Sequence, residues 1–183
     1  MTISKIHNRM KKLVGKELYM SKKELILDQL ELSRNSESWI KPLSMALEDL
    51  SIEEIVWKQN EATHSILEIV NHLYFYNERW LKRFKGELPT EMIESNASTF
   101  FEFDNVSKDD WQNLVKRLDE NLANWQEVIK KSEESKLHEQ IPAFPVDAVW
   151  WGALSNLCTH NTYHIGQIIH IRKAQGSWKV KEE

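Results

Sequence analysis

The chain has 183 residues, a formal net charge of −4 at pH 7, 41% hydrophobic residues and 28% charged residues. These values are typical of one globular domain and argue against a disordered or membrane-inserted protein. Five Gly and four Pro are too few for the many turns of a β-sandwich or barrel. The acidic balance lacks the basic face of nucleic-acid-binding domains, and no apolar run approaches the roughly 20 residues of a membrane span. We therefore expect a mostly helical, cytoplasmic protein with no nucleic-acid or membrane partner.

Residues 1–20 are predicted to form an N-terminal extension, separate from a domain over residues 21–183. The extension is basic and lacks the apolar core of a secretory signal. Met20, followed by Ser21, is a second candidate for the start of the chain, so we assign this segment no function. The single cysteine, Cys158, cannot form an internal disulfide and is interpreted as a small buried hydrophobic residue.

The first predicted helix runs from about Lys22 to Leu50. Pro42 lies inside this segment and should kink the helix or restart it near Trp39. The apolar side chains fall along one face, as in an amphipathic helix: Leu25, Leu32, Trp39, Leu43 and Leu50.

Two capping boxes, in which a serine and an acidic residue three positions later satisfy each other's backbone N–H groups, mark the next helix starts. Ser51 with Glu54 opens a short turn, and Ser65 with Glu68 opens a helix that ends at about residue 85, before Gly86. The predicted inward stripe of this second helix is Ile66, Ile69, Leu73, Tyr76, Trp80 and Phe84.

A third capping box, Ser107 with Asp110, opens a helix to about residue 131. The fourth helix is predicted to begin near Asp147, a favourable N-cap, and to end at Gly176. The inward stripe of the third helix is Trp111, Leu114, Leu118, Leu122, Trp125 and Ile129.

Long connections join these helices over residues 87–106 and 134–146. The length of the middle connection predicts an all-α fold, a four-helix bundle with a long crossover connection. Residues 99–103 form an apolar, β-prone patch within it, which we interpret as a lid on the bundle rather than a strand.

The fourth helix carries polar residues where an apolar seam is expected. His160, His164 and Gln167 follow Trp150 at alternating steps of three and four, as interior positions of a bundle do. Burying them without partners would cost several kcal/mol. The two histidines project about 40° apart, with Cβ atoms about 5–6 Å apart. At that spacing both imidazoles can reach one metal ion at about 2.1 Å.

His72 is the best candidate for a third ligand, because it lies in the second helix beside the inward residues Ile69 and Leu73. Three neutral imidazoles with an open position are typical of a catalytic metal site. The alternative is a set of core histidines that bond to carbonyls or to one another. The remaining histidines fit less well by position: His7, His64, His138 and His170.

Other metal motifs do not match. Asn161 stands where a zinc peptidase helix carries its general-base glutamate. A di-iron bundle needs two Glu-x-x-His motifs, whereas this chain has one, Glu61 to His64, ahead of its helix. Asn161 and Gln167 could orient bound groups or act as outer or surface amides, and no convincing general base is evident.

The motifs together resemble the DinB superfamily: His72 in Ile-Val-Asn-His-Leu, then residues 159–168, Thr-His-Asn-Thr-Tyr-His-Ile-Gly-Gln-Ile, then Arg172 and Gly176-Ser177-Trp178. The resemblance covers about residues 21–178. It implies a four-helix bundle with a long crossover, often a homodimer, that binds one divalent ion, zinc or nickel, through the matching His72, His160 and His164. Characterised members of that family include bacillithiol-dependent S-transferases and a mycothiol-dependent maleylpyruvate isomerase.

Our leading hypothesis is therefore a metal-dependent enzyme acting on a small molecule, with a low-molecular-weight thiol as co-substrate. A hydrolase on the same metal site is the second hypothesis. A non-catalytic stress-response bundle that binds a metal or ligand is the third.

Overall fold

The structure is a computed structural model that describes residues 20–88, 95–101, 105–144 and 146–179. Four long helices form a bundle: α2 (Lys22–Arg34), α5 (Ile66–Phe84), α6 (Lys108–Lys131) and α7 (Trp150–Ala174). The short helices are α3 (Leu43–Ala46), α4 (Ile52–Val56), and the 3₁₀ turns η1 (Ala97–Thr99) and η2 (Glu134–His138). The predicted all-α four-helix bundle is confirmed over the described residues. The predicted extension falls largely outside them, since residues 1–19 are not described.

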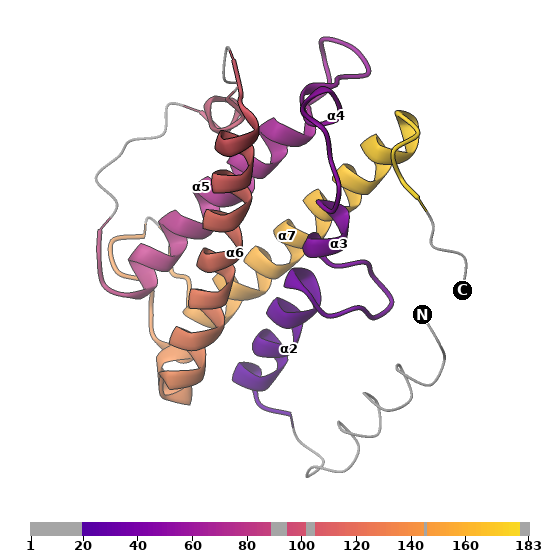
Figure 1. Cartoon of the computed structure of the whole chain (residues 1–183). Coiled ribbons are helices and arrows are strands. Elements are labelled where there is room, and N and C mark those ends of the chain that lie inside the picture. The colour runs from indigo at the N-terminus through magenta and orange to yellow at the C-terminus, as the bar shows by residue number, and fades with distance from the viewer. Residues whose placement is uncertain (1–19, 89–94, 102–104, 145, 180–183) are drawn as a thin grey trace.

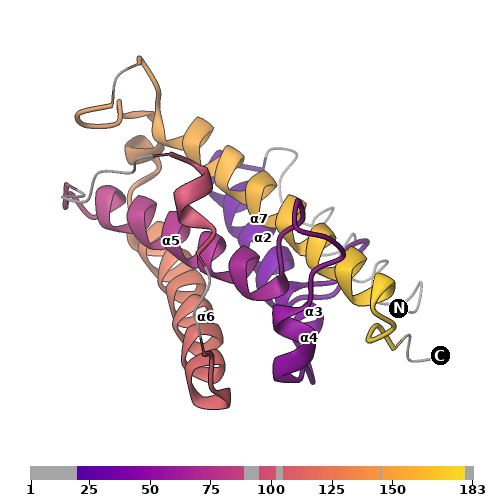
Figure 2. The ribbon, with the colours of Figure 1, turned by 90° about the horizontal axis from the view of Figure 1, so that it is seen from above.

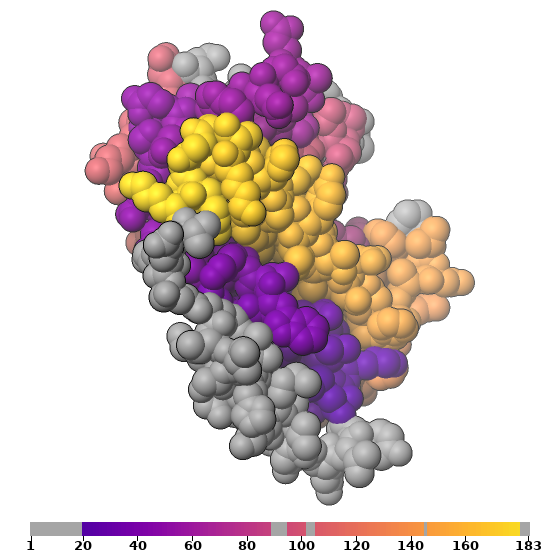
Figure 3. Space-filling view, turned by 90° about the vertical axis from the view of Figure 1, so that its right-hand side faces the viewer, coloured from indigo at the N-terminus to yellow at the C-terminus, as the bar shows by residue number. Residues whose placement is uncertain are grey.

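The four long helices pack in a ring in which α2 and α5 each contact both α6 and α7. Figures 1 and 2 show α5 and α6 on one side and α2 beside α7 on the other. Figure 3 shows α7 lying open along one face, next to α2. The segment from 35 to 65, with α3 and α4, crosses from α2 to α5. The predicted site of the crossover was therefore wrong, because the connection over residues 87–106 joins α5 and α6, which pack directly against each other. None of the described helices combines the length and apolar character needed to cross a membrane.

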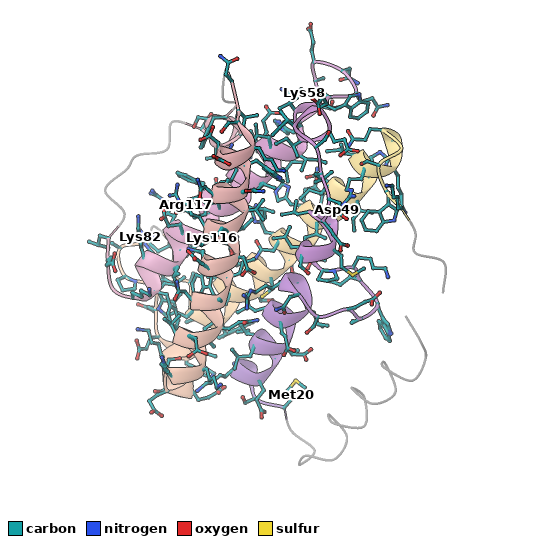
Figure 4. The ribbon with its side chains drawn as sticks, in the orientation of Figure 1. Met20, Asp49, Lys58, Lys82, Lys116 and Arg117 are labelled. Atoms are coloured by element: carbon teal, nitrogen blue, oxygen red, sulfur yellow. The ribbon has the colours of Figure 1, made fainter. Side chains whose placement is uncertain are left out.

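Helix starts follow the predicted capping boxes. Ser51, Ser65 and Ser107 each accept the backbone N–H of the acidic residue three positions later, and that acid accepts the serine N–H in return. All six predicted apolar residues of α6 are buried. Figure 4 shows charged side chains on the opposite, outer surfaces of α5 and α6, including Lys82, Lys116 and Arg117.

The first predicted helix was too long. It ends at Arg34, where the N–H groups of Asn35 and Ser36 both bond to the Glu31 carbonyl. Asn and Ser side chains favour turns over helix interiors, and Pro42 cannot continue a helix, so the chain restarts only at α3. Trp39 of the predicted stripe consequently lies outside the helix and is 81% exposed. Leu25 lies on α2 itself but is 47% exposed, because the helix buries a different face, with Ile26, Leu30 and Ser33.

The predicted N-cap of the fourth helix was also wrong. The cap residue is Val149, which makes no side-chain cap, and Asp147 lies ahead of the helix. The backbone of Ala148 and Val149 pairs instead with residues 139–141, including a bond from Ile141 N–H to the Ala148 carbonyl at 2.9 Å. This pairing holds the chain extended up to residue 149 and delays the helix.

Two apolar clusters fill the bundle, one around Leu73, Leu118 and Ile165 and the other around Trp125, Trp150 and Leu154. Along α5 and α7 the two clusters are separated by polar residues. Asn77 and Asn161 lie at this level, 0% and 3% exposed, and their amides bond to each other at 2.8 and 3.1 Å. The bundle therefore has a polar layer between two apolar clusters, next to His160, while His72 and His164 lie among the residues of the first cluster.

Candidate metal centre

Helices α5 and α7 bring the three predicted histidines together. His72 lies in the middle of α5 and is 2% exposed, and His164 on α7 is 4% exposed. His160 is half-buried one turn before His164. Among the described residues, these three form the one group of His, Cys, Asp or Glu side chains placed to hold a metal ion.

The Nε2 atoms of the three rings converge. His160 Nε2 lies 2.9 Å from His72 Nε2 and 3.2 Å from His164 Nε2. One potential ligand nitrogen from each ring lies within 4.8 Å of the other two. The rings are tilted or edge-on to one another, with centroids 4.5–5.0 Å apart, so they approach through their nitrogen edges rather than by stacking.

Hydrogen bonds on the outer nitrogens assign the tautomers of two of these rings. Gln167 Oε1, which can only accept, lies 2.6 Å from His164 Nδ1. Thr99 Oγ1 lies 2.6 Å from His72 Nδ1 and donates its own proton to the Asn96 carbonyl, so it accepts from the imidazole. Both rings therefore carry their proton on Nδ1 and direct an Nε2 lone pair inward.

Burial keeps these imidazoles neutral. Loss of solvation lowers the pKa of His72 to about 3, with His164 and His160 adding to the shift, and it lowers the pKa of His164 to about 4. Burial also lowers the pKa of His160. Neutral imidazole is the form that binds a metal, so the rings stay in their metal-binding form over a wide pH range.

The three residues fit a divalent metal ion. Two inward lone pairs face His160 Nε2, which carries at most one proton and cannot satisfy both well. Nitrogens that share a tetrahedral ion at about 2.1 Å lie roughly 3.4 Å apart, so the separations of His160 Nε2 from His72 Nε2 and from His164 Nε2, 2.9 and 3.2 Å, would each lengthen by about half an ångström or less. Outer partners of the kind made by Thr99 and Gln167 are typical of metal-binding histidines.

Comparison with known proteins identifies the family to which the chain belongs. The family model of the DinB superfamily matches residues 38–168. The chain belongs to the DinB superfamily. A comparison with curated protein sequences finds no match.

Among solved structures, this DinB-superfamily chain is similar to YfiT from Bacillus subtilis. The two are 18% identical with a TM-score of 0.67, over 90% of this chain and 94% of that one. YfiT is described as "a probable metal-dependent hydrolase with an unusual four-helix bundle topology". At this identity the likeness shows that the two proteins share a fold.

A cavity of about 520 Å³ adjoins the histidine cluster of this DinB-superfamily protein. His160 and Tyr76 line it, and the Tyr76 ring packs edge-on against His160 and His72 at 5.5 and 4.8 Å. Tyr76 and Trp80 were predicted to be core residues of α5, but both are half-buried and face this cavity. Its volume is in the range of small-molecule sites.

Residues 99–101 belong to the site, as the predicted lid implies. Thr99 is buried, and the Phe100 ring stacks on His72 at 3.8 Å and on His64 at 3.9 Å. Residues 102 and 103 of the predicted lid lie outside the described residues. Thr99 and Phe100 were not singled out as individual contacts of His72, because no spacing rule connects this loop to α5.

The other candidates take different places. His64 lies outside Phe100 rather than in the cluster, and His138 and His170 lie apart from it, as predicted. His7 is outside the described residues. Gln167 orients His164, which is one of its two predicted roles, whereas the Asn161 amide pairs with Asn77. Cys158 is buried, and burial raises its pKa to about 12, as expected for a structural thiol.

Proposed function

We propose that this protein is a metal-dependent enzyme that acts on a small molecule, using one divalent ion, zinc or nickel, held by His72, His160 and His164. The observation that carries the proposal is the convergence of three Nε2 atoms, two of them with an inward lone pair fixed by Thr99 and Gln167. The alternative is a set of core histidines that bond to one another, in which a proton on His160 Nε2 would be donated to one of the two facing Nε2 atoms and the other would be left without a donor.

The chain's own residues would position the reactants. A bound divalent ion supplies Lewis acidity that favours the deprotonated form of a thiol or water near neutral pH. Thr99 and Gln167 hold two ligand rings in the coordinating tautomer. Tyr76 and His160 place the cluster at the wall of the 520 Å³ cavity, whose apolar lining would exclude water from a bound substrate.

A low-molecular-weight thiol is the nucleophile we favour. Within the described chain, the hydrogen-bond partners of the three rings outside the cluster are a hydroxyl and an amide, and no carboxylate general base is among them. A thiol, with a pKa of about 8.5, needs less help to lose its proton than water does. The leading function is therefore thiol S-transfer to an electrophile, in line with the family resemblance.

Hydrolysis at the same site is the second candidate. The observation that favours it is the structural likeness to YfiT, described as a probable metal-dependent hydrolase. Water would then take the place of the thiol, and the same three histidines would be required.

Metal content tests the site. Purified full-length protein should contain about one divalent ion per chain by elemental analysis, and His72→Ala and His160→Ala should lose it. His170→Ala is the matched control, because His170 is an exposed histidine on the same helix as His160. No ion in the wild-type protein after incubation with zinc or nickel would overturn the metal proposal and favour a plain histidine core.

Turnover of an electrophilic chloroaromatic and of an activated ester, each with and without added cysteine as the thiol, tests the reaction. Turnover that depends on both metal and thiol supports S-transfer. Metal-dependent turnover of the ester without thiol supports hydrolysis. Ligand-dependent stabilisation with no turnover would instead indicate a non-catalytic binding bundle.

A further inference from the structure

We infer that the 520 Å³ cavity beside His160 binds the ring of a neutral aromatic molecule and that Gly152 leaves the room for it. The inference rests on the proposed function in one respect, because it names this aromatic molecule as the substrate of the proposed enzyme. The ring-binding site itself is argued from the cavity walls, which are independent of any metal.

Aromatic side chains form one wall of the cavity. The rings of Trp80 and Phe144 lie with centroids 5.5 Å apart at 54°. The Arg83 guanidinium contacts both rings, at 5.8 and 5.6 Å from their centroids, and donates to the Ala143 carbonyl at 3.3 Å. The wall is thus tied between α5 and the loop before α7, and it offers ring edges and faces to a planar apolar ligand.

Gly152 faces the same cavity from the first turn of α7. Glycine is a poorer helix former than alanine, by up to about 1 kcal/mol in a helix interior, so its presence at position 152 is not explained by helix propensity. A Cβ added at Gly152 would meet no atom within 4 Å. Packing within the described protein therefore does not require the glycine, and the space in front of it is open to a ligand.

Two polar residues of the cavity, Tyr76 and Asn96, lie near the histidine cluster. The Tyr76 hydroxyl donates to Asn96 Oδ1 at 3.0 Å, and the Tyr76 ring packs on His160. Asp147 is the one carboxylate among the described residues that line the cavity, and no lysine or arginine of the described chain lines it. These features favour a neutral ring over an anionic one, with its polar substituent directed to the cluster.

A matched control exists on the same helix. Gly166 also lies inside α7, and an added Cβ there would likewise meet nothing within 4 Å. It lines a different cavity, of about 450 Å³, which none of the three cluster histidines lines. Replacing either glycine by leucine should keep or raise the melting temperature, because leucine favours the helix. Only the replacement at 152 should fill the aromatic cavity.

The test is equilibrium dialysis of 2-naphthol and its anionic counterpart 2-naphthoate against the full-length, zinc-loaded protein. We expect the wild type to bind 2-naphthol more tightly than 2-naphthoate. Gly152→Leu should weaken 2-naphthol binding by about tenfold or more, while Gly166→Leu should stay within about twofold of the wild type. Phe144→Ala removes one ring of the wall and should also weaken 2-naphthol binding. This variant replaces Gly152→Leu in the test if Gly152→Leu does not fold.

Several results would overturn the inference: no binding of 2-naphthol, equal loss in both glycine variants, unchanged binding in Gly152→Leu, or equal affinity for 2-naphthoate. Repeating the dialysis on metal-free protein separates this inference from the proposed function. Ring binding that persists without metal supports the cavity assignment, even if elemental analysis later rejects the metal site. Loss of 2-naphthol binding when the metal is removed would contradict the inference that the cavity walls bind the ring without the metal.

Discussion

Thr99 Oγ1 accepts a hydrogen bond from His72 Nδ1 at 2.6 Å, although the two residues are 27 positions apart and Thr99 lies outside the four long helices. The same hydroxyl donates to the Asn96 carbonyl at 2.6 Å. Thr99 therefore fixes both the tautomer and the orientation of His72, and the loop that carries it is part of the site.

Removing this hydroxyl should weaken metal binding without unfolding the bundle. Thr99→Val keeps the shape of the side chain but leaves His72 Nδ1 without its acceptor. Loss of such an outer partner typically lowers metal affinity by about 10- to 100-fold. Competition with a chromophoric zinc chelator would measure the change. Thr99→Ser, which retains the hydroxyl, should bind zinc nearly as the wild type does, and equal affinity in Thr99→Val would contradict the role.

Acid should destabilise the metal-free protein through its buried histidines. The pKa is lowered to about 3 for His72 and about 4 for His164 in the folded chain, mainly by burial, against about 6.5 in an unfolded chain. Between these values the unfolded state binds protons that the folded state does not. Their contribution to the free energy of unfolding is therefore fully present above about pH 6.5 and is lost as the pH falls toward 4.

Urea unfolding of chelator-treated protein between about pH 7.5 and pH 4.5 measures this dependence. Carboxylates also titrate at the acid end, so the comparison of slopes with a variant is what matters. His72→Gln should show a shallower fall, while His170→Gln, an exposed change, should keep the wild-type slope. Identical slopes in all three proteins would show that burial of His72 is not responsible.

The paired amides of Asn77 and Asn161 should matter for stability. Both side chains are buried, and each amide group donates to the other's oxygen. Asn161→Ala would leave the Asn77 oxygen without this donor in the core, at a cost of about 1–3 kcal/mol in the free energy of unfolding. Chemical denaturation measures it. Asn156→Ala, on the same helix but exposed, is the control and should change the free energy little.

Cys158 should be inert in the folded protein. Burial raises its pKa to about 12, so very little thiolate exists at neutral pH. We expect no modification by a thiol-specific disulfide reagent over minutes at pH 7.5, and stoichiometric modification in denaturant. Rapid labelling of the native protein would mean that α7 opens locally around this residue.

The starts of α5, which carries His72, and of α6 could be predicted because their signals are local. Ser65 with Glu68 begins α5 and Ser107 with Asp110 begins α6 through contacts only three residues apart. The pairing of His160 with His164 is local in the same sense, since one helical turn sets their spacing. His72 could be proposed as their partner from its place near the apolar stripe of α5.

The errors arose where distant contacts override local preference. Asp147 is a favourable cap, but pairing of Ala148 with Ile141 keeps the chain extended to residue 149. Trp39 fitted an apolar spacing, yet the chain had already left α2 at Arg34 and the ring is exposed.

By itself the sequence determined the all-α architecture and the helix starts marked by capping boxes, because periodicity and capping depend on neighbours within a turn. It also identified His72, His160 and His164 as candidate metal ligands. The tertiary structure alone decided that Thr99 holds His72, that Asn77 pairs with Asn161, and that Tyr76 and Trp80 line a cavity, with Trp80 also packed against the apolar cluster around Trp150. Those relationships depend on how α5, α7 and the 95–101 loop pack against one another, which no local spacing specifies.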